Sequence, residues 1–405
     1  MSEAPYALRG RVVTNSSIIV DGAVVIDGEA ITWVGEATDA AAAGWGEQVV
    51  QAVSPTDGRY LLPGLVDVHC HGGGGASFPD ASNEAEVMTA VMEHRRHGTT
   101  TMVASLVTAS PEVLRRQAML LAEVCEDGEL AGIHFEGPFV SEGHCGAQNP
   151  EFIQAPNPAL TRELMIVTRG YTVTMTLAPE KRRASGSGSV TEALIDNGAL
   201  PSFGHTSTDA AQMREALRDA RERLALNPMR RSPRATITHL FNGMEPPHHR
   251  DPGPIYEAIA DAAGGGVILE LIGDGVHVSP DTVRAVYEIV GRDSVVLVTD
   301  AMAAAGMADG QYLLGSLDVT VDEGQARLTG GTSLAGGTAH LLDVVRTTWQ
   351  GGVPLVDAVF MATKQGARII GDEYLGDLAP GMWADIVVVD EDLQPMSVYR
   401  RGTQV

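Results

Sequence analysis

The chain has 405 residues, of which 44% are hydrophobic, and it carries a formal net charge of −24. This length allows one large domain with a smaller one beside it, and the acidic balance argues against a nucleic-acid partner. No apolar run is long enough to span a bilayer, so we expect no membrane association. The three cysteines, Cys70, Cys125 and Cys145, form no Cys-x-x-Cys pair, which is typical of free thiols in the cytoplasm.

Short strand-like segments separated by Asn-Ser and Asp-Gly turns begin the chain. They are Ser17–Val20, Ala23–Ile26 and Ile31–Val34. Two similar segments, Ala384–Asp390 and Met396–Arg400, end it. We therefore predict that residues 1–57 and 371–405 pair into one small β-sandwich domain.

Between residues 61 and 300, short apolar runs alternate with longer stretches of helical character. Strands that alternate with helices imply a parallel sheet, and eight such units in about 250 residues match a closed (β/α)₈ barrel. The runs are Leu65–His69, Thr100–Leu106, Gly132–Glu136, Thr172–Ala178, Pro201–His205, Thr236–His239, Val267–Gly273 and Val295–Asp300. The sequence thus predicts an α/β fold with a TIM barrel over residues 58–370.

The end of this region has its own predicted elements. Residues 311–330 are typical of one additional hairpin. Helical patterns over Thr338–Trp349 and Leu355–Ile370 are expected to close the barrel.

The first barrel run ends in the segment Asp67-Val68-His69-Cys70-His71-Gly72. Side chains two positions apart in a strand point the same way, roughly 6.6 Å apart along the backbone, so both imidazoles can face one metal ion. A His-x-His pair alone is a weak signal. Cys70 alternates to the opposite face and is expected to be a buried thiol.

Four other runs also end in residues that can bind metals. In a barrel, the carboxyl ends of all strands meet at one mouth. Any one of these residues alone would be interpreted as a core or rim residue, but their joint occurrence predicts a metal site. With the His-x-His pair, its ligands are His69, His71, Glu136, His205, His239 and Asp300.

Longer motifs surround these ligands. They are Pro63–Gly72, His134–Phe139, Leu177–Glu180, Gly204–Thr206, Thr238–Met244, Asp274–His277, Val298–Met302 and Leu334–Gly336. Across essentially the whole chain, this set resembles the amidohydrolase superfamily. The Glu-Gly-Pro, His-Leu-Phe-Asn-Gly-Met and Asp-Gly-x-His elements are similar to its N-acetylglucosamine-6-phosphate deacetylase branch.

The resemblance implies a hydrolase that converts N-acetylglucosamine 6-phosphate to glucosamine 6-phosphate and acetate in amino-sugar and cell-wall recycling. Glu136, His205 and His239 would hold the metal that all members share, and His69 with His71 would hold a second ion. Nitrogen and oxygen ligands suit Zn²⁺ or Fe²⁺. Asp300 would transfer the protons, and the chain would form a homodimer.

The resemblance also implies which residues bind the phosphorylated amino sugar. Arg250 and His277 would bind the phosphate, since arginine makes two-point contacts with that group. The remaining substrate contacts would come from Ala147, Gln148, Asn242, Gly243, Asp274, Leu334, Ala335 and Gly336. Some relatives place His before Asn-Pro, where this chain has Gln148-Asn149-Pro150 with His144 and Cys145 slightly earlier, so the sequence leaves open which group supports the substrate here.

Three alternative functions would use parts of the same residue pattern. A related design bridges its metals with a carbamylated lysine, but Lys181 is expected to be a solvated loop residue. Another amidohydrolase, such as a cyclic amidase or a deaminase, would use a similar barrel mouth but would not need Arg250 and His277. A non-catalytic protein with this fold would usually lack part of the ligand set.

Overall fold

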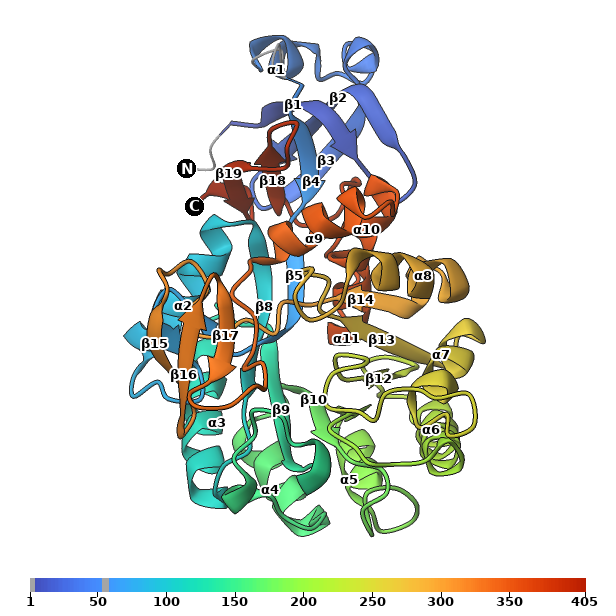
Figure 1. The fold of residues 1–405 in the computed structure, drawn as a ribbon. Helices are drawn as coiled ribbons and strands as arrows, with labels where there is room; N and C mark the ends of the chain where they lie inside the picture. Colours follow the sequence, from blue (N-terminus) through green and yellow to red (C-terminus); the bar gives the residue numbers. More distant parts are fainter. Residues whose placement is uncertain (1–3, 53–57) are drawn as a thin grey trace.

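The computed structural model describes residues 4–52 and 58–405. Its centre is an eight-stranded parallel sheet in the order β14-β13-β12-β11-β10-β9-β8-β5 (Figure 1). The strands are β5 (Leu65–Cys70), β8 (Thr99–Leu106), β9 (Gly132–Phe139), β10 (Thr172–Leu177), β11 (Leu200–Phe203), β12 (Ala235–Ile237), β13 (Val267–Leu271) and β14 (Val295–Leu297). Each predicted run supplies one strand, so the predicted barrel is confirmed.

Backbone hydrogen bonds nearly close this barrel between β14 and β5. The Asp300 N–H donates to the His69 carbonyl at 2.9 Å, and the His71 N–H donates to the Ala301 carbonyl at 2.7 Å. The segment that carries His69 and His71 therefore lies directly beside Asp300.

Helices follow the strands and cover the outside of the barrel. They are α2 (Glu84–Arg96), α3 (Pro111–Glu126), α4 (Pro158–Val167), α5 (Val190–Asp196), α6 (Ala210–Leu226), α7 (Ile255–Ala263) and α8 (Pro280–Val290). Most begin at an Asn, Ser or Asp whose side chain accepts a hydrogen bond from the first turn, as Ser110 does for α3 and Asp209 does for α6. None of the helices in the described ranges meets the length and apolarity that crossing a membrane requires.

The last helical region differs from its prediction. The helix α9 spans Leu341–Gln350, but the single helix expected over Leu355–Ile370 is two helices, α10 (Leu355–Met361) and α11 (Lys364–Ile370). The break falls at Thr363, where φ is −132° and ψ is −84°. The Thr363 hydroxyl donates to the Val359 carbonyl at 2.7 Å, and this local hydrogen bond competes with the helical ladder.

Strands from both ends of the chain form a separate seven-stranded sheet in the order β20-β19-β18-β4-β1-β2-β3. They are β1 (Tyr6–Val13), β2 (Ile18–Asp27), β3 (Ala30–Glu36), β4 (Tyr60–Pro63), β18 (Ile386–Val389), β19 (Pro395–Arg400) and β20 (Thr403–Gln404), with α1 (Gly46–Gln51) packed beside them. The two segments expected over Ser17–Val20 and Ala23–Ile26 are one strand, β2. A small sheet domain built from both termini is confirmed, while its predicted boundary at residue 57 lies outside the described residues.

A three-stranded antiparallel sheet lies beside the barrel mouth, at the left of Figure 1. It comprises β15 (Gly310–Leu314), β16 (Leu317–Asp322) and β17 (Gln325–Leu328), whereas the sequence predicted one hairpin over residues 311–330. Glu323 and Gly324 join the last two strands with φ values of 48° and 72°, which is typical of a tight two-residue turn. A short hairpin of β6 (Gly72–Gly73) and β7 (Ala76–Ser77) follows β5.

Candidate metal centre

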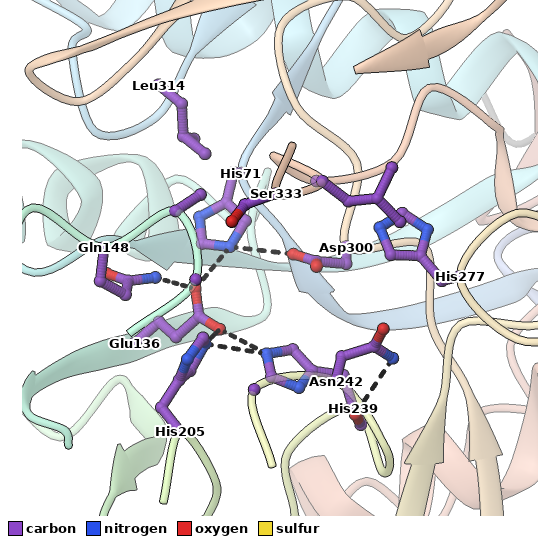
Figure 2. A pocket seen from close by; sticks show the side chains of 15 residues that line it. His71, Glu136, Gln148, His205, His239, Asn242, His277, Asp300, Leu314 and Ser333 are labelled. Carbon is purple, nitrogen blue, oxygen red and sulfur yellow. Dashed lines mark hydrogen bonds and ion pairs between the residues drawn. The ribbon is translucent and has the colours of Figure 1, made fainter. Parts of the chain in front are cut away.

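Three of the predicted ligands lie just beyond the ends of their strands. β11, β12 and β14 end at Phe203, Ile237 and Leu297. His205, His239 and Asp300 follow with φ values of 47°, 27° and 48°, a region that residues other than glycine seldom adopt. Such backbone strain is concentrated at functional sites, where the surrounding structure holds a side chain in one direction. Here it turns three side chains into the barrel mouth (Figure 2).

His69, His71, Glu136 and Asp300 form one group of possible ligands. The Nε2 atoms of His69 and His71 lie 3.2 Å apart. The Asp300 Oδ1 lies 3.3 Å from the first and 3.2 Å from the second, and the Glu136 Oε2 lies 3.2 Å from the His71 Nε2. All four side chains are buried.

Glu136, His205 and His239 form a second group. The Glu136 Oε1 lies 2.9 Å from the His205 Nε2 and 2.8 Å from the His239 Nε2. Those two nitrogens are 3.1 Å apart. Figure 2 shows Glu136 between the two groups, with one carboxylate oxygen turned toward each.

The donor atoms in each group fit a shared divalent cation. Tetrahedral ligands at about 2.0–2.1 Å from Zn²⁺ lie about 3.3 Å from one another, close to the spacings found here. Three imidazoles bind protein groups through Nδ1, which leaves Nε2 for the centre. His69 Nδ1 donates to Glu270 at 3.0 Å, His71 Nδ1 to the Ser105 carbonyl at 3.2 Å, and His205 Nδ1 to the His144 carbonyl at 2.8 Å.

The electrostatics of the cluster follow from burial and close charges. Burial lowers the pKa of His69, but Asp300, Glu270 and Glu136 outweigh it and raise that pKa to about 10. The same opposition raises the pKa values of His71 and His205 above the usual value. Burial raises the pKa of Asp300, yet the adjacent His69 and His71 lower it to about 2, so this carboxylate is ionised.

A cavity of about 250 Å³ opens onto the cluster. Its lining includes seven of the predicted substrate residues, which are Ala147, Gln148, Asn242, Gly243, His277, Leu334 and Gly336. Gly146, Leu314 and Ser333 also line it and were not predicted. Leu314 comes from β15, and no sequence motif placed that strand at the barrel mouth.

Three predicted substrate residues do not line this cavity. Ala335 is buried, and its N–H donates to the Ala326 carbonyl at 3.0 Å. The Asp274 carboxylate accepts a hydrogen bond from the His277 Nδ1 at 2.7 Å and therefore orients that ring. Arg250 lies on an exposed loop, where it contacts His249 at 2.8 Å.

Gln148 occupies the position where some relatives have His. Its Nε2 donates to the Glu136 Oε2 at 2.6 Å, and its Oε1 accepts from the Thr108 N–H at 2.6 Å. Gln148 therefore holds Glu136 while it lines the cavity. Neither Cys145 nor His144 lines the cavity, although the His144 carbonyl accepts from His205.

Lys181 does not approach the cluster. Its Nζ donates to the Glu142 Oε1 at 2.8 Å, and it is absent from the cavity lining. A carbamylated lysine bridge at this residue is therefore excluded by position. Cys70, Cys125 and Cys145 are free thiols, as expected.

Comparisons with known proteins show which family the chain resembles. The Amidohydrolase family matches residues 60–405. The chain is 30% identical to N-acetylglucosamine-6-phosphate deacetylase of Bacillus subtilis (strain 168), over 96% of this chain and 94% of that protein. It is also 30% identical to N-acetylgalactosamine-6-phosphate deacetylase of Escherichia coli O157:H7, over 88% of this chain and 90% of that protein.

A solved structure extends this similarity to the fold. A variant of N-acetyl-D-glucosamine-6-phosphate deacetylase from Mycobacterium smegmatis, in complex with N-acetyl-D-glucosamine-6-phosphate, is similar with a TM-score of 0.85 and 34% identity. The match covers 99% of each chain.

Proposed function

The chain belongs to the amidohydrolase family, and we propose that it hydrolyses the acetamide of N-acetylglucosamine 6-phosphate to glucosamine 6-phosphate and acetate. The observation that carries this proposal is the pair of ligand groups that share Glu136 and border the cavity. The similarity to deacetylases across nearly the whole chain supports the substrate class. A cytoplasmic location and a homodimer belong to the same proposal.

Two metal ions per chain, Zn²⁺ or Fe²⁺, are part of the proposal. Glu136, His205 and His239 would hold one ion, and His69 with His71 would hold the other, with Glu136 shared and Asp300 beside His69 and His71. A divalent ion bound there supplies Lewis acidity, which lowers the pKa of water and polarises an amide carbonyl. This chemistry suits an acetamide, whose carbonyl is a poor electrophile.

Asp300 performs the proton transfers in this proposal. It is ionised, it lines the cavity, and its Oδ1 lies within 3.3 Å of both His69 and His71. It accepts a proton from water as the oxygen attacks the acetyl carbon. It then returns that proton to the nitrogen as the C–N bond breaks, because an amine does not leave as an anion. Acetate and the free amine are the products.

The sugar would occupy the part of the cavity lined by Asn242, Gly243 and His277 on one side and by Leu334 and Gly336 on the other. Burial lowers the pKa of His277, but the hydrogen bond and charge of Asp274 outweigh it and raise that pKa, which favours a protonated imidazole whose Nε2–H could donate to a phosphate. Arg250 stands outside the cavity in a single chain. It would meet the phosphate through movement of its loop or across the proposed dimer.

Replacing Arg250 with Ala tests the phosphate contact. We expect KM for N-acetylglucosamine 6-phosphate to rise about 10- to 100-fold, because a charge-assisted hydrogen bond contributes about 1.5–3 kcal/mol. KM for the unphosphorylated sugar should change little. Steady-state kinetics on both substrates measure the difference, and Arg182→Ala, on a separate exposed loop, serves as the control. Equal effects on both substrates would exclude a phosphate contact.

Metal uptake should release protons. The pKa of His69 is raised to about 10, so the metal-free cluster holds a proton at neutral pH that an ion must displace, and the pKa values of His71 and His205 are shifted in the same direction. Affinity should therefore rise with pH up to about 10, the pKa of His69. The free energy of unfolding of the metal-free protein has the opposite dependence on pH. The contribution of these protonated histidines is fully present below the pKa of His in the unfolded chain, and it is lost as the pH rises through the raised pKa in the folded protein.

Calorimetry in two buffers of different ionisation enthalpy counts these protons. We expect roughly one or more protons released per ion bound at pH 7. Metal binding with no buffer dependence would contradict the protonated cluster.

Acetate-release assays test the proposed activity itself. The substrates are N-acetylglucosamine 6-phosphate, its unphosphorylated parent, N-acetylgalactosamine 6-phosphate and a hydantoin. The galactosamine epimer is included because one relative is named for it. Fastest turnover of N-acetylglucosamine 6-phosphate supports the proposal, preference for the epimer would shift the substrate, and turnover of the hydantoin alone would reject deacetylation.

A further inference from the structure

Glu270 is a buried carboxylate that lies behind the metal centre. It belongs to β13, is 1% exposed, and does not line the cavity. Within the described ranges, the structure gives it no ion pair with Lys or Arg, and its charged neighbour is His69. A buried carboxylate is costly unless hydrogen bonds or an opposite charge compensate it, so its contacts explain why it is retained.

One oxygen of Glu270 serves both ligand groups. The Oε2 accepts a hydrogen bond from the His69 Nδ1 at 3.0 Å and another from the His239 backbone N–H at 3.2 Å. The Glu270 carbonyl also accepts from the Leu240 N–H at 2.9 Å. Glu270 therefore holds the imidazole of one group and the strained backbone of the other.

The contact to His69 differs from those of the other ligand imidazoles. His71 and His205 donate Nδ1–H to neutral backbone carbonyls, whereas His69 donates to a charged carboxylate. A carboxylate partner fixes the tautomer with the Nε2 lone pair toward the centre and makes that nitrogen a stronger ligand. The negative charge also offsets the positive charge that a second ion would bring into a buried site.

We propose that Glu270 is a positioning residue that sets the metal affinity of the His69/His71 group, and thereby whether the chain holds one ion or two. This inference rests on the proposed two-ion centre. The group of Glu136, His205 and His239 depends on Glu270 only through a backbone hydrogen bond, which a neutral acceptor can replace. Loss of the Glu270 charge should therefore weaken one ion selectively.

The test is a Zn²⁺ titration of the metal-free full chain against a competing chelator, for wild type, Glu270→Gln and Glu163→Gln. Glu163 is a carboxylate on α4 that pairs with Arg115, so it serves as a matched control. We expect wild type and Glu163→Gln to bind two ions, and Glu270→Gln to bind one ion normally and the other 10- to 100-fold more weakly. His69→Gln should weaken the same ion.

Other outcomes overturn the inference in distinguishable ways. Two ions bound equally tightly by wild type and Glu270→Gln would overturn the role of Glu270 alone. A wild-type protein that saturates at one ion would overturn both the role of Glu270 and the two-ion proposal. A wild-type protein that binds two ions but does not deacetylate the substrate would overturn the proposed function and leave the role of Glu270 supported. If Glu270→Gln does not fold, Glu270→Asp is tested instead, because Asp keeps the negative charge but holds it farther from His69. Weaker binding of one ion by Glu270→Asp would support the proposed role of Glu270. Binding of both ions as in wild type would overturn it.

Discussion

Replacing Asp300 with Asn should lower kcat for the phosphorylated substrate by about 10²- to 10⁴-fold, the usual contribution of a general acid–base group. Asn has the same shape and retains an oxygen that can occupy the Oδ1 position beside His69 and His71. It cannot accept a proton from water at neutral pH. The expected result is therefore a folded protein that binds metal and substrate and fails in turnover.

Three measurements separate this result from a loss of structure. Metal content per chain and the thermal unfolding midpoint should stay close to wild type, and KM should change less than kcat. Asp318→Asn, an exposed carboxylate on β16, is the matched control and should keep full activity. An Asp300→Asn variant with near-normal kcat would remove the assignment, and one that loses its metal would make Asp300 chiefly a ligand.

The barrel and the clustering of the six candidate ligands were predictable from sequence because both depend on short-range patterns. Each apolar run is one strand, and each ligand stands at or just after the end of its run. The left-handed backbone at His205, His239 and Asp300 was not predictable, because it is imposed by neighbouring strands and not by the local residue type. The break at Thr363 was missed for a different reason, since its local hydroxyl bond to the Val359 carbonyl interrupts a sequence that has continuous helical periodicity.

Contacts between distant segments account for most of what sequence reasoning missed. Leu314 and Ser333 reach the cavity because the sheet β15–β17 packs beside the mouth, and no local motif encodes that packing. Glu270 was missed because its run was interpreted only as a strand, while its contacts lie 201 residues away at His69. Arg250 was predicted from a motif, but a motif does not show whether an exposed loop meets the cavity.

Glu136→Gln is expected to have the widest effect on the metal centre, because Glu136 is the residue that both ligand groups share. Its Oε1 faces His205 and His239, and its Oε2 faces His71. The Gln side chain has one carbonyl oxygen and one NH₂ group. In either orientation, one of the two sets of ligands therefore meets the NH₂ group, which cannot bind a cation. We expect metal content to fall by at least one ion per chain and kcat to fall on the order of 10³-fold, since metal ions contribute several kcal/mol to such reactions.

Variants that remove a ligand from only one of the two groups show whether Glu136 binds two ions or one. His71→Gln and His205→Gln each remove a ligand from only one group, and Glu222→Gln on the surface of α6 is the control. If two ions are held, each histidine variant should lose one ion under conditions where the control keeps both. If His71→Gln keeps the wild-type metal content and activity, the pair His69 and His71 holds no ion, and Glu136 is then an ordinary ligand of a one-metal enzyme. The metal content of His71→Gln therefore decides between the one-metal and the two-metal form of the site.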